Sequence, residues 1–363
     1  MQQPLSWLWL AWVLGAGAKT AEVLRLYPTA QELFEAVGRE DMRGLFTAAQ
    51  QKRLTQGRPE DFAPVWAECQ RLGVQVITWQ DEAYPPQMRR IEDAPLVLYC
   101  TGNPQALQQE CMVALIGSRR PSQYGVEAAR ALSTQLAQQQ VCLVSGLADG
   151  LDSEAHKASV EANAPTVAVL GTPIDRTYPA SNRTLRRKVE QVGAVISEYA
   201  PGSSTSARHF LQRNRLIAAL SHGVCVVEAR EKSGTMNTVH HAQRYDRPVF
   251  AVPGAIFSPL CEGTNRLLED GLAKAVSSGN AILKGLGRRA SCSVETTPAK
   301  EEPAFPLSPQ AQQMAKVLTA KPQSLDALVA ATGLAAGDAL AALLELELSG
   351  LAQSGAGGQY RSR

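Results

Sequence analysis

An apolar run that stops at small and basic residues is the first feature of this sequence with chemical potential. Residues 113–116 (VALI) are followed by Gly117, Ser118, Arg119 and Arg120. Such a run predicts a buried strand that ends in a loop. A loop of this composition offers backbone N–H groups, a hydroxyl and guanidinium groups to phosphate oxygens. We therefore expect a phosphate site here, either for a small nucleotide or for a polymer.

Other apolar runs end in similar loops. The run VCLV precedes Ser145 and Gly146, and the run VCVVEA precedes a loop that contains Ser233, Gly234 and Thr235. Two more loops of small, hydroxylated or basic residues follow the runs TVAVL and AVISE. In an open α/β sheet these loops meet at the carboxyl ends of the strands, where ligands bind. The sequence contains neither GxGxxG nor GxxxxGK[ST], so a dinucleotide fingerprint and a Walker loop are both absent.

The distribution of charge favours a polymer as the phosphate carrier. The chain has a formal net charge of only +2, yet no acidic residue lies between Asp175 and Glu190 or between Glu198 and Glu228. These stretches carry eight arginines and lysines, which indicates a basic track more than a single pocket. Phe210 lies within the second stretch, where its ring could stack on a base or belong to the core.

Residues that could catalyse a reaction are sparse. The five histidines are scattered, and neither HExxH nor GxSxG occurs. Asp152, Glu154 and His156 lie close in sequence, but Asp152 and His156 have the spacing of an ordinary helix pair. The seven cysteines form no CxxC pair and are interpreted as reduced residues of a cytosolic protein. We therefore expect no enzyme activity, no metal and no cofactor.

The elements expected to position these loops form an α/β domain. Residues 71–285 alternate eight short β-branched runs with amphipathic helical patterns, which predicts a doubly wound, mostly parallel sheet. Residues 1–70 are helical in pattern, and the stretch GAGAKTA has the glycine spacing of a helix-hairpin-helix or SAM-like module. A packing role and a DNA-binding role for this helical domain are equally compatible with the pattern.

The two ends of the chain raise separate questions. The apolar stretch SWLWLAWVL has the composition of a signal-peptide core, but no Lys or Arg precedes it. We expect a buried helix and a cytoplasmic protein without a membrane span, with secretion as the alternative.

Residues 286–306 lack periodicity and are expected to be a linker. Residues 307–363 have the pattern of a winged helix, but 322–360 carry four acids and no Lys or Arg. This favours a contact with protein over binding to duplex DNA.

The stretches IGSRRPSQYG, SGLADGLDSEAHKASV, VLGTPIDRTYPASNRTL, HFLQRNRLIAALSHGVCVVEA and KSGTMNTVHHA resemble the DNA-processing protein A (DprA, or Smf) family over residues 90–275. The resemblance implies an extended Rossmann-like fold between a SAM-like helical domain and a winged-helix domain. It also implies a homodimer that is not an enzyme. Its expected role is to bind and protect incoming single-stranded DNA and load the recombinase RecA onto it during natural transformation.

The resemblance also implies particular contacts. It places a phosphate on Gly117, Ser118 and Arg119 and a base on Phe210. Together with the loop analysis it gives the expected DNA-binding residues: Gly117, Ser118, Arg119, Arg120, Ser145, Gly146, Arg208, Phe210, Arg213, Asn214, Arg215, Ser233, Gly234 and Thr235. Some family members have a lysine where this chain has Ala207, and Arg208 could replace it. Asp149 replaces an uncharged or basic residue and is expected to point away from the DNA.

An enzymatic alternative comes from a second resemblance. The stretch SGTMNT is similar to the glycine–threonine loop of phosphoribohydrolases, which share a Rossmann-like core with the DprA family. The PGGxGT run of those enzymes is missing here, although Glu228 ends the preceding strand. A nucleotide-processing enzyme related to them is therefore the alternative function.

Overall fold

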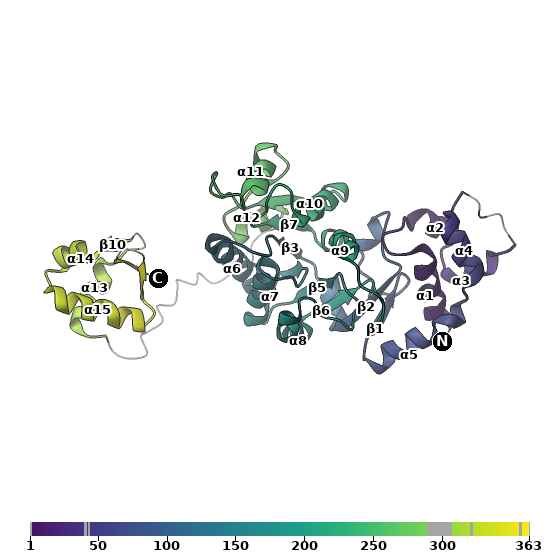
Figure 1. Ribbon diagram of the computed structural model, residues 1–363, viewed down its shortest axis with the longest axis horizontal. Helices are drawn as coiled ribbons and strands as arrows, with labels where there is room; N and C mark the ends of the chain where they lie inside the picture. Colours follow the sequence, from purple (N-terminus) through teal and green to yellow (C-terminus); the bar gives the residue numbers. More distant parts are fainter. Residues whose placement is uncertain are drawn as a thin grey trace. The chain divides into compact units, whose positions relative to one another are not determined.

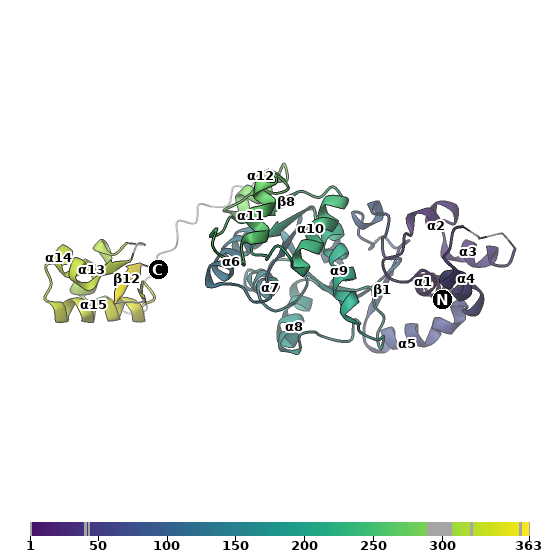
Figure 2. The ribbon, with the colours of Figure 1, turned by 45° about the horizontal axis from the view of Figure 1, so that its top comes forward.

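A computed structural model describes residues 2–39, 42, 44–288, 307–319, 322–355 and 358–362. The chain divides into two compact units, Met1–Ser291 and Cys292–Arg363, which we describe separately. Most of the expected linker, residues 289–306, lies outside the described residues. Figures 1 and 2 show the ribbon of both units.

A nine-stranded sheet of the described residues forms the centre of the first unit, in the order β1-β2-β6-β5-β4-β3-β7-β8-β9. Neighbours from β6 to β9 are parallel, whereas β2 pairs antiparallel with both β1 and β6. The prediction of a mostly parallel α/β sheet is confirmed. The strands are β1 (Gln75–Thr78), β2 (Val97–Gly102), β3 (Met112–Ile116), β4 (Cys142–Ser145), β5 (Thr166–Leu170), β6 (Ala194–Ser197), β7 (Gly223–Val226), β8 (Val249–Ala251) and β9 (Lys274–Ala275).

Helices cover both faces of this sheet, which explains why its central strands are apolar throughout. One face carries α6 (Gln123–Gln138), α7 (Leu151–Glu161), α8 (Arg183–Val192) and α12 (Gly279–Gly285). The other face carries α9 (Ala207–Leu220) and α10 (Gly234–Arg244), with α11 (Glu262–Glu269) after β8. Short 3₁₀ turns, η2 (Met88–Arg90), η3 (Pro104–Gln108) and η4 (Ala180–Asn182), join some of these elements.

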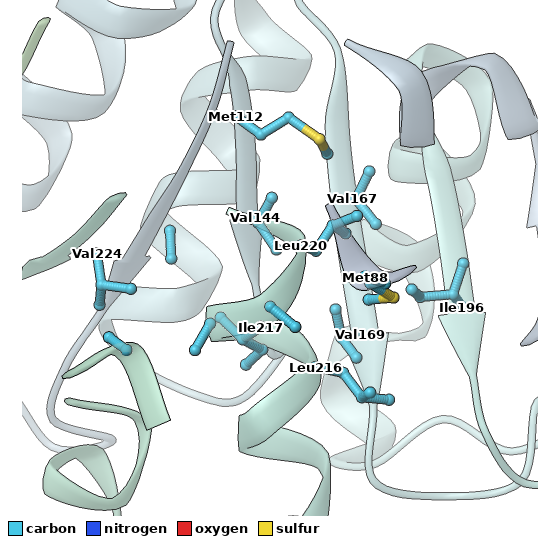
Figure 3. Close-up of a cluster of buried hydrophobic side chains, with 14 of the residues drawn as sticks. Met88, Met112, Val144, Val167, Val169, Ile196, Leu216, Ile217, Leu220 and Val224 are labelled. Carbon is cyan, nitrogen blue, oxygen red and sulfur yellow. The ribbon is translucent and has the colours of Figure 1, made fainter. Parts of the chain in front are cut away.

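The C-terminal half of α9 is anchored in the core of this second face. Leu216, Ile217 and Leu220 are buried beside valines of β4 and β5, as Figure 3 shows. This packing fixes the position of α9 on the sheet, so that its polar N-terminal half extends to the carboxyl ends of the strands. Burying a Leu or Ile side chain contributes about 1.5–3 kcal/mol.

The N-terminal helices are continuous with this unit. They are α1 (Gln2–Leu14), α2 (Ala21–Leu26), α3 (Ala30–Ala36), α4 (Ala48–Gln56), η1 (Pro59–Phe62) and α5 (Ala63–Arg71). Trp9 of α1 is fully buried and donates a hydrogen bond from Nε1 to the carbonyl of Gly57, at 2.9 Å. One apolar cluster joins α1 to β2, through Leu10 and Val97 among others. The expectation that the N-terminal stretch forms a buried helix agrees with this structure.

The second unit is a winged helix, as its sequence predicts. It contains α13 (Pro309–Val317), α14 (Leu325–Thr332), α15 (Ala336–Leu348) and a small sheet of β10 (Gln323–Ser324), β12 (Gln359–Ser362) and β11 (Ala352–Gly355). Its own core centres on Met314, Leu328 and Leu343. In the described part of the chain no single helix is long and apolar enough to cross a membrane. Helices α14 and α15 reach the length and hydropathy of a membrane span only when they are taken together, and a bend of 106° separates them.

Candidate nucleic-acid interface

A cavity of about 290 Å³ lies at the carboxyl ends of β3 and β7, beside the N-terminal halves of α9 and α10. Helices α9 and α10 lie side by side in Figures 1 and 2. Nine of the fourteen expected DNA-binding residues line this cavity: Gly117, Ser118, Arg119, Phe210, Arg213, Asn214, Ser233, Gly234 and Thr235.

Side-chain hydrogen bonds join the segments around the cavity. The Thr235 hydroxyl donates to the carbonyl of Gly117 at 3.2 Å, which links the loop after β3 to the start of α10. Asn214 on α9 donates from Nδ2 to the carbonyl of Gly234 at 3.1 Å. The three segments are therefore held as one surface before any ligand binds.

Several donors at this surface are free to bind an anion. Ser118 accepts a hydrogen bond at Oγ from the Arg120 backbone N–H, at 3.1 Å, so its hydroxyl proton can be donated elsewhere. Ser233 precedes α10, and its Oγ has no hydrogen-bond partner among the described residues, but this atom is buried and reaches a ligand only if the side chain turns toward the cavity. The first turn of α10 carries no acidic residue. Its unpaired N–H groups and the helix dipole favour a negative charge at this position.

An aromatic and a cationic group meet at the mouth of the cavity. The Arg119 guanidinium carbon is 5.8 Å from the centre of the half-buried Phe210 ring. The Tyr178 ring also packs against Phe210, with its centre 5.2 Å from that of the Phe210 ring and a tilt of 55° between the two planes. A Cβ at Gly171 would lie 2.8 Å from Cδ1 of Phe210, so the close approach of α9 to the end of β5 requires glycine. A phosphate group and a base can thus be bound close together.

Two buried ionisable residues, Arg213 and Asp152, also line the cavity. Arg213 is 4% exposed and donates from Nη1 to the carbonyls of Gly146, at 2.7 Å, and Val169. Asp152 accepts a hydrogen bond from the Gly146 backbone N–H at 3.1 Å. Burial lowers the pKa of Arg213 to about 10, although the nearby Asp152 opposes this shift. Burial likewise raises the pKa of Asp152, against the opposing effect of Arg213. These two groups position the loop after β4 and contribute little net charge to a ligand.

The structure does not bring the other five expected residues into the cavity. Ser145 is fully buried, and its hydroxyl donates to the carbonyl of Leu115 at 2.7 Å. Gly146 is also buried, with its N–H and carbonyl engaged as described above. Arg120 and Arg208 are exposed but do not line the cavity.

Arg215 is the clearest correction to the expected set. Its side chain is 3% exposed and forms an ion pair with Glu198, with an N–O distance of 2.5 Å. It also donates to the carbonyl of Asp93 at 2.8 Å. The basic stretch on α9 therefore divides into exposed Arg208 and two buried arginines, because the helix turns positions 213 and 215 into the protein.

Sequence reasoning passed over Tyr178 and Arg230 in this region, and it considered Asp152 only as a candidate acid–base group. Tyr178 was not singled out, because an aromatic residue in a loop does not reveal its neighbours. Asp152 and Arg230 line the cavity as well. The stretch DRTYP follows a strand, and that position is the signal that could have indicated Tyr178. Asp149 is exposed, accepts a bond from the Ser181 hydroxyl at 3.4 Å and does not line the cavity.

The candidate acid–base groups do not form a reaction centre. His156 is buried against Thr166, with a distance of 2.8 Å between Nδ1 and Oγ1, and Glu154 pairs with Arg130 and Lys157. Glu228 accepts hydrogen bonds from the backbone N–H of Ser122, at 2.9 Å, and from its hydroxyl. Glu228 thus holds the start of α6 and does not line the cavity.

Two family models match this chain. The model of DNA recombination-mediator protein A matches residues 75–287, and that of the DprA winged helix domain matches residues 298–358. Protein Smf of Synechocystis is 32% identical over 82% of this chain and 82% of its own length. DNA processing protein DprA of Streptococcus pneumoniae is 39% identical over 56% of this chain and 71% of its own length.

Solved structures give the same result. The X-ray structure of DprA from Streptococcus pneumoniae superposes with a TM-score of 0.65 at 31% identity, covering 77% of this chain and 97% of that one. A Helicobacter pylori DprA structure, described for its single-stranded DNA binding mode, superposes with a TM-score of 0.53 at 32% identity. It covers 58% of this chain and 95% of that one. The chain therefore belongs to the DNA recombination-mediator protein A family, also known as DprA or Smf.

Proposed function

We propose that this protein binds single-stranded DNA in the cavity between α9 and α10 and loads a RecA recombinase onto that strand. The observation that carries the proposal is the contact of Arg119 with Phe210, next to the hydroxyl of Ser118 and the N-terminus of α10. A cationic group beside a half-buried aromatic ring suits one nucleotide of a strand, with its phosphate and its base bound close together. The relative from Helicobacter pylori, described for binding single-stranded DNA, supports this assignment.

The geometry favours a single strand over a duplex. A base can stack on Phe210 only when it is unpaired and turned away from a partner strand. Phosphate contacts alone would not distinguish the two forms of DNA. The half-buried ring, with Arg119 at its face and Tyr178 at its side, supplies that distinction.

The remaining parts of the proposal follow from family membership. We infer that the protein acts in the cytoplasm as a homodimer, protects incoming DNA and serves natural transformation. Light scattering or sedimentation of the full chain tests the dimer. RecA loading is tested by the rate at which RecA begins ATP hydrolysis on DNA coated with single-strand-binding protein. A rate unchanged by this protein would remove RecA loading from the proposal.

The first experiment is fluorescence anisotropy with a labelled oligo-dT strand at three salt concentrations, with duplex DNA and ATP as competitors. We expect tight binding that weakens steeply with salt and that neither competitor displaces. Displacement by ATP would indicate a nucleotide pocket and the alternative enzyme function. An absence of any binding to the strand would contradict the proposed function itself.

A further inference from the structure

Helix α8 carries a row of exposed cations that the cavity does not use. Arg183 and Arg187 are exposed, lie one turn apart and have no ion-pair partner among the described residues. Lys188 and Arg176, in the loop before the helix, are exposed as well. Arg186 behaves differently, because its side chain is only 11% exposed, forms an ion pair with Glu190 at 2.9 Å and donates a hydrogen bond to the carbonyl of Ile174. The helix thus separates one structural arginine from cations that face solvent.

Tyr178 connects this row to the cavity. Its side chain is 56% exposed, although its ring packs on Phe210. The chain runs from Tyr178 through η4 directly into α8, so Arg183 begins the helix at the same edge of the sheet as the cavity. An exposed aromatic ring at this position is available to a second base. The ring and the cations therefore continue the surface that begins at Arg119.

The carboxylates nearest to this row in sequence and packing do not neutralise it. Asp175 accepts a hydrogen bond from the Gly202 backbone N–H at 3.2 Å, and Asp149 accepts one from Ser181. On α7, which packs against α8, Glu154 pairs with two cations of its own. Glu161, the last residue of α7, is exposed and forms no ion pair with α8. The surface of α8 keeps a net positive charge, which suits a phosphodiester backbone.

We propose that single-stranded DNA leaves the cavity across Tyr178 and continues along α8, with phosphates bound by Arg183 and Arg187. This inference rests on the proposed function, because it extends the path of the same strand. Tyr178 would stack a base next to the one on Phe210, and the turn between Arg183 and Arg187 would accommodate successive phosphates. The protein would then have a longer binding site than the cavity alone provides.

The test compares a short oligo-dT that fills only the cavity with a longer one. In the double variant Arg183→Ala/Arg187→Ala we expect weaker binding of the long strand and unchanged binding of the short one. The salt slope for the long strand should fall by about 1.4, because each lost phosphate contact contributes about 0.7. Tyr178→Ala should weaken the long strand more than the short one, because its ring also supports Phe210 in the cavity. Tyr178→Phe keeps the ring and should bind like the unmodified protein.

The matched control removes two exposed cations elsewhere. Arg25→Ala/Lys52→Ala, on α2 and α4, changes the net charge equally and should leave both affinities and slopes unchanged. Equal losses in the control and the α8 variant would reduce the effect to net charge and overturn the proposed path. Unchanged binding of the long strand by the folded α8 variant would also overturn it. A protein that binds neither strand contradicts the proposed function instead, so the two failures differ.

Discussion

The guanidinium of Arg119 and the ring of Phe210 lie 5.8 Å apart, although one follows β3 and the other belongs to α9. The relationship depends on two local features. The apolar strand β3 ends at Ile116 and is followed by Gly117, which places Arg119 at the sheet edge, and glycine at 171 lets α9 approach β5. Arg119, which can bind phosphate, and Phe210, which can stack on a base, therefore lie side by side at the edge of the sheet.

Arg119→Ala should weaken binding of single-stranded DNA and lower its salt slope by about 0.7, since one phosphate contact is lost. Arg119→Lys should retain the slope but lose part of the affinity, because a lysine lacks the planar group that lies over Phe210. Anisotropy titrations at several salt concentrations measure both quantities. An Arg119→Ala protein with the original slope and affinity would show that this residue does not contact phosphate.

Phe210→Ala should reduce affinity through a different physical effect. Loss of a stacked base costs about 1–3 kcal/mol, and the salt slope should stay constant because no phosphate contact changes. Phe210→Trp supplies the matched variant, since it retains an aromatic face. If Phe210→Ala lowered the slope as much as Arg119→Ala does, the ring would be positioning the cation and not binding a base.

Arg215→Met tests whether a buried arginine of the same basic stretch stabilises the fold and does not bind DNA. Removing one partner of a buried ion pair leaves Glu198 uncompensated and should cost about 3–5 kcal/mol of the free energy of unfolding. The salt slope of the remaining folded protein should not change. Urea denaturation measures the loss of stability, and anisotropy measures the salt slope of DNA binding. A lower salt slope in folded Arg215→Met would show that Arg215 contacts a phosphate of the DNA.

The sequence predicts the parts of the site that depend on local pattern. A buried strand followed by Gly117, Ser118 and Arg119 indicates a phosphate loop, because strand ends and their loops are short-range features. The burial of Arg215 could not be predicted this way, since its partner Glu198 lies on another element. Tyr178 escaped notice for the same reason, because its contact with Phe210 arises only when the loop after β5 reaches α9.

His156 makes stability depend on pH. Burial lowers the pKa of His156 from its ordinary 6.5 to about 3, so the folded protein binds fewer protons than the unfolded chain between these values. Its contribution to stability is therefore complete above pH 6.5 and decreases as the pH falls towards 3, by about 1.4 kcal/mol per pH unit. His156→Asn should show a flatter loss of stability in urea titrations across this range. His240→Asn, which changes an exposed histidine, is the control. If the stability of His156→Asn fell with pH in parallel with that of the control, His156 would not be the source of this pH dependence.

The winged-helix unit should not bind duplex DNA, because its third helix lacks the required chemistry. Leu340, Leu344 and Leu348 are exposed on α15, and its charged residues are the three acids Asp338, Glu345 and Glu347. A helix of this composition cannot neutralise phosphates, whose contacts supply most of the affinity for DNA. The fragment 307–363 has its own buried core and can be studied alone. We expect circular dichroism to show a folded fragment and anisotropy to show no binding of duplex DNA at low salt. Salt-dependent binding of the duplex by this fragment would contradict the prediction and make the winged helix a second DNA-binding unit.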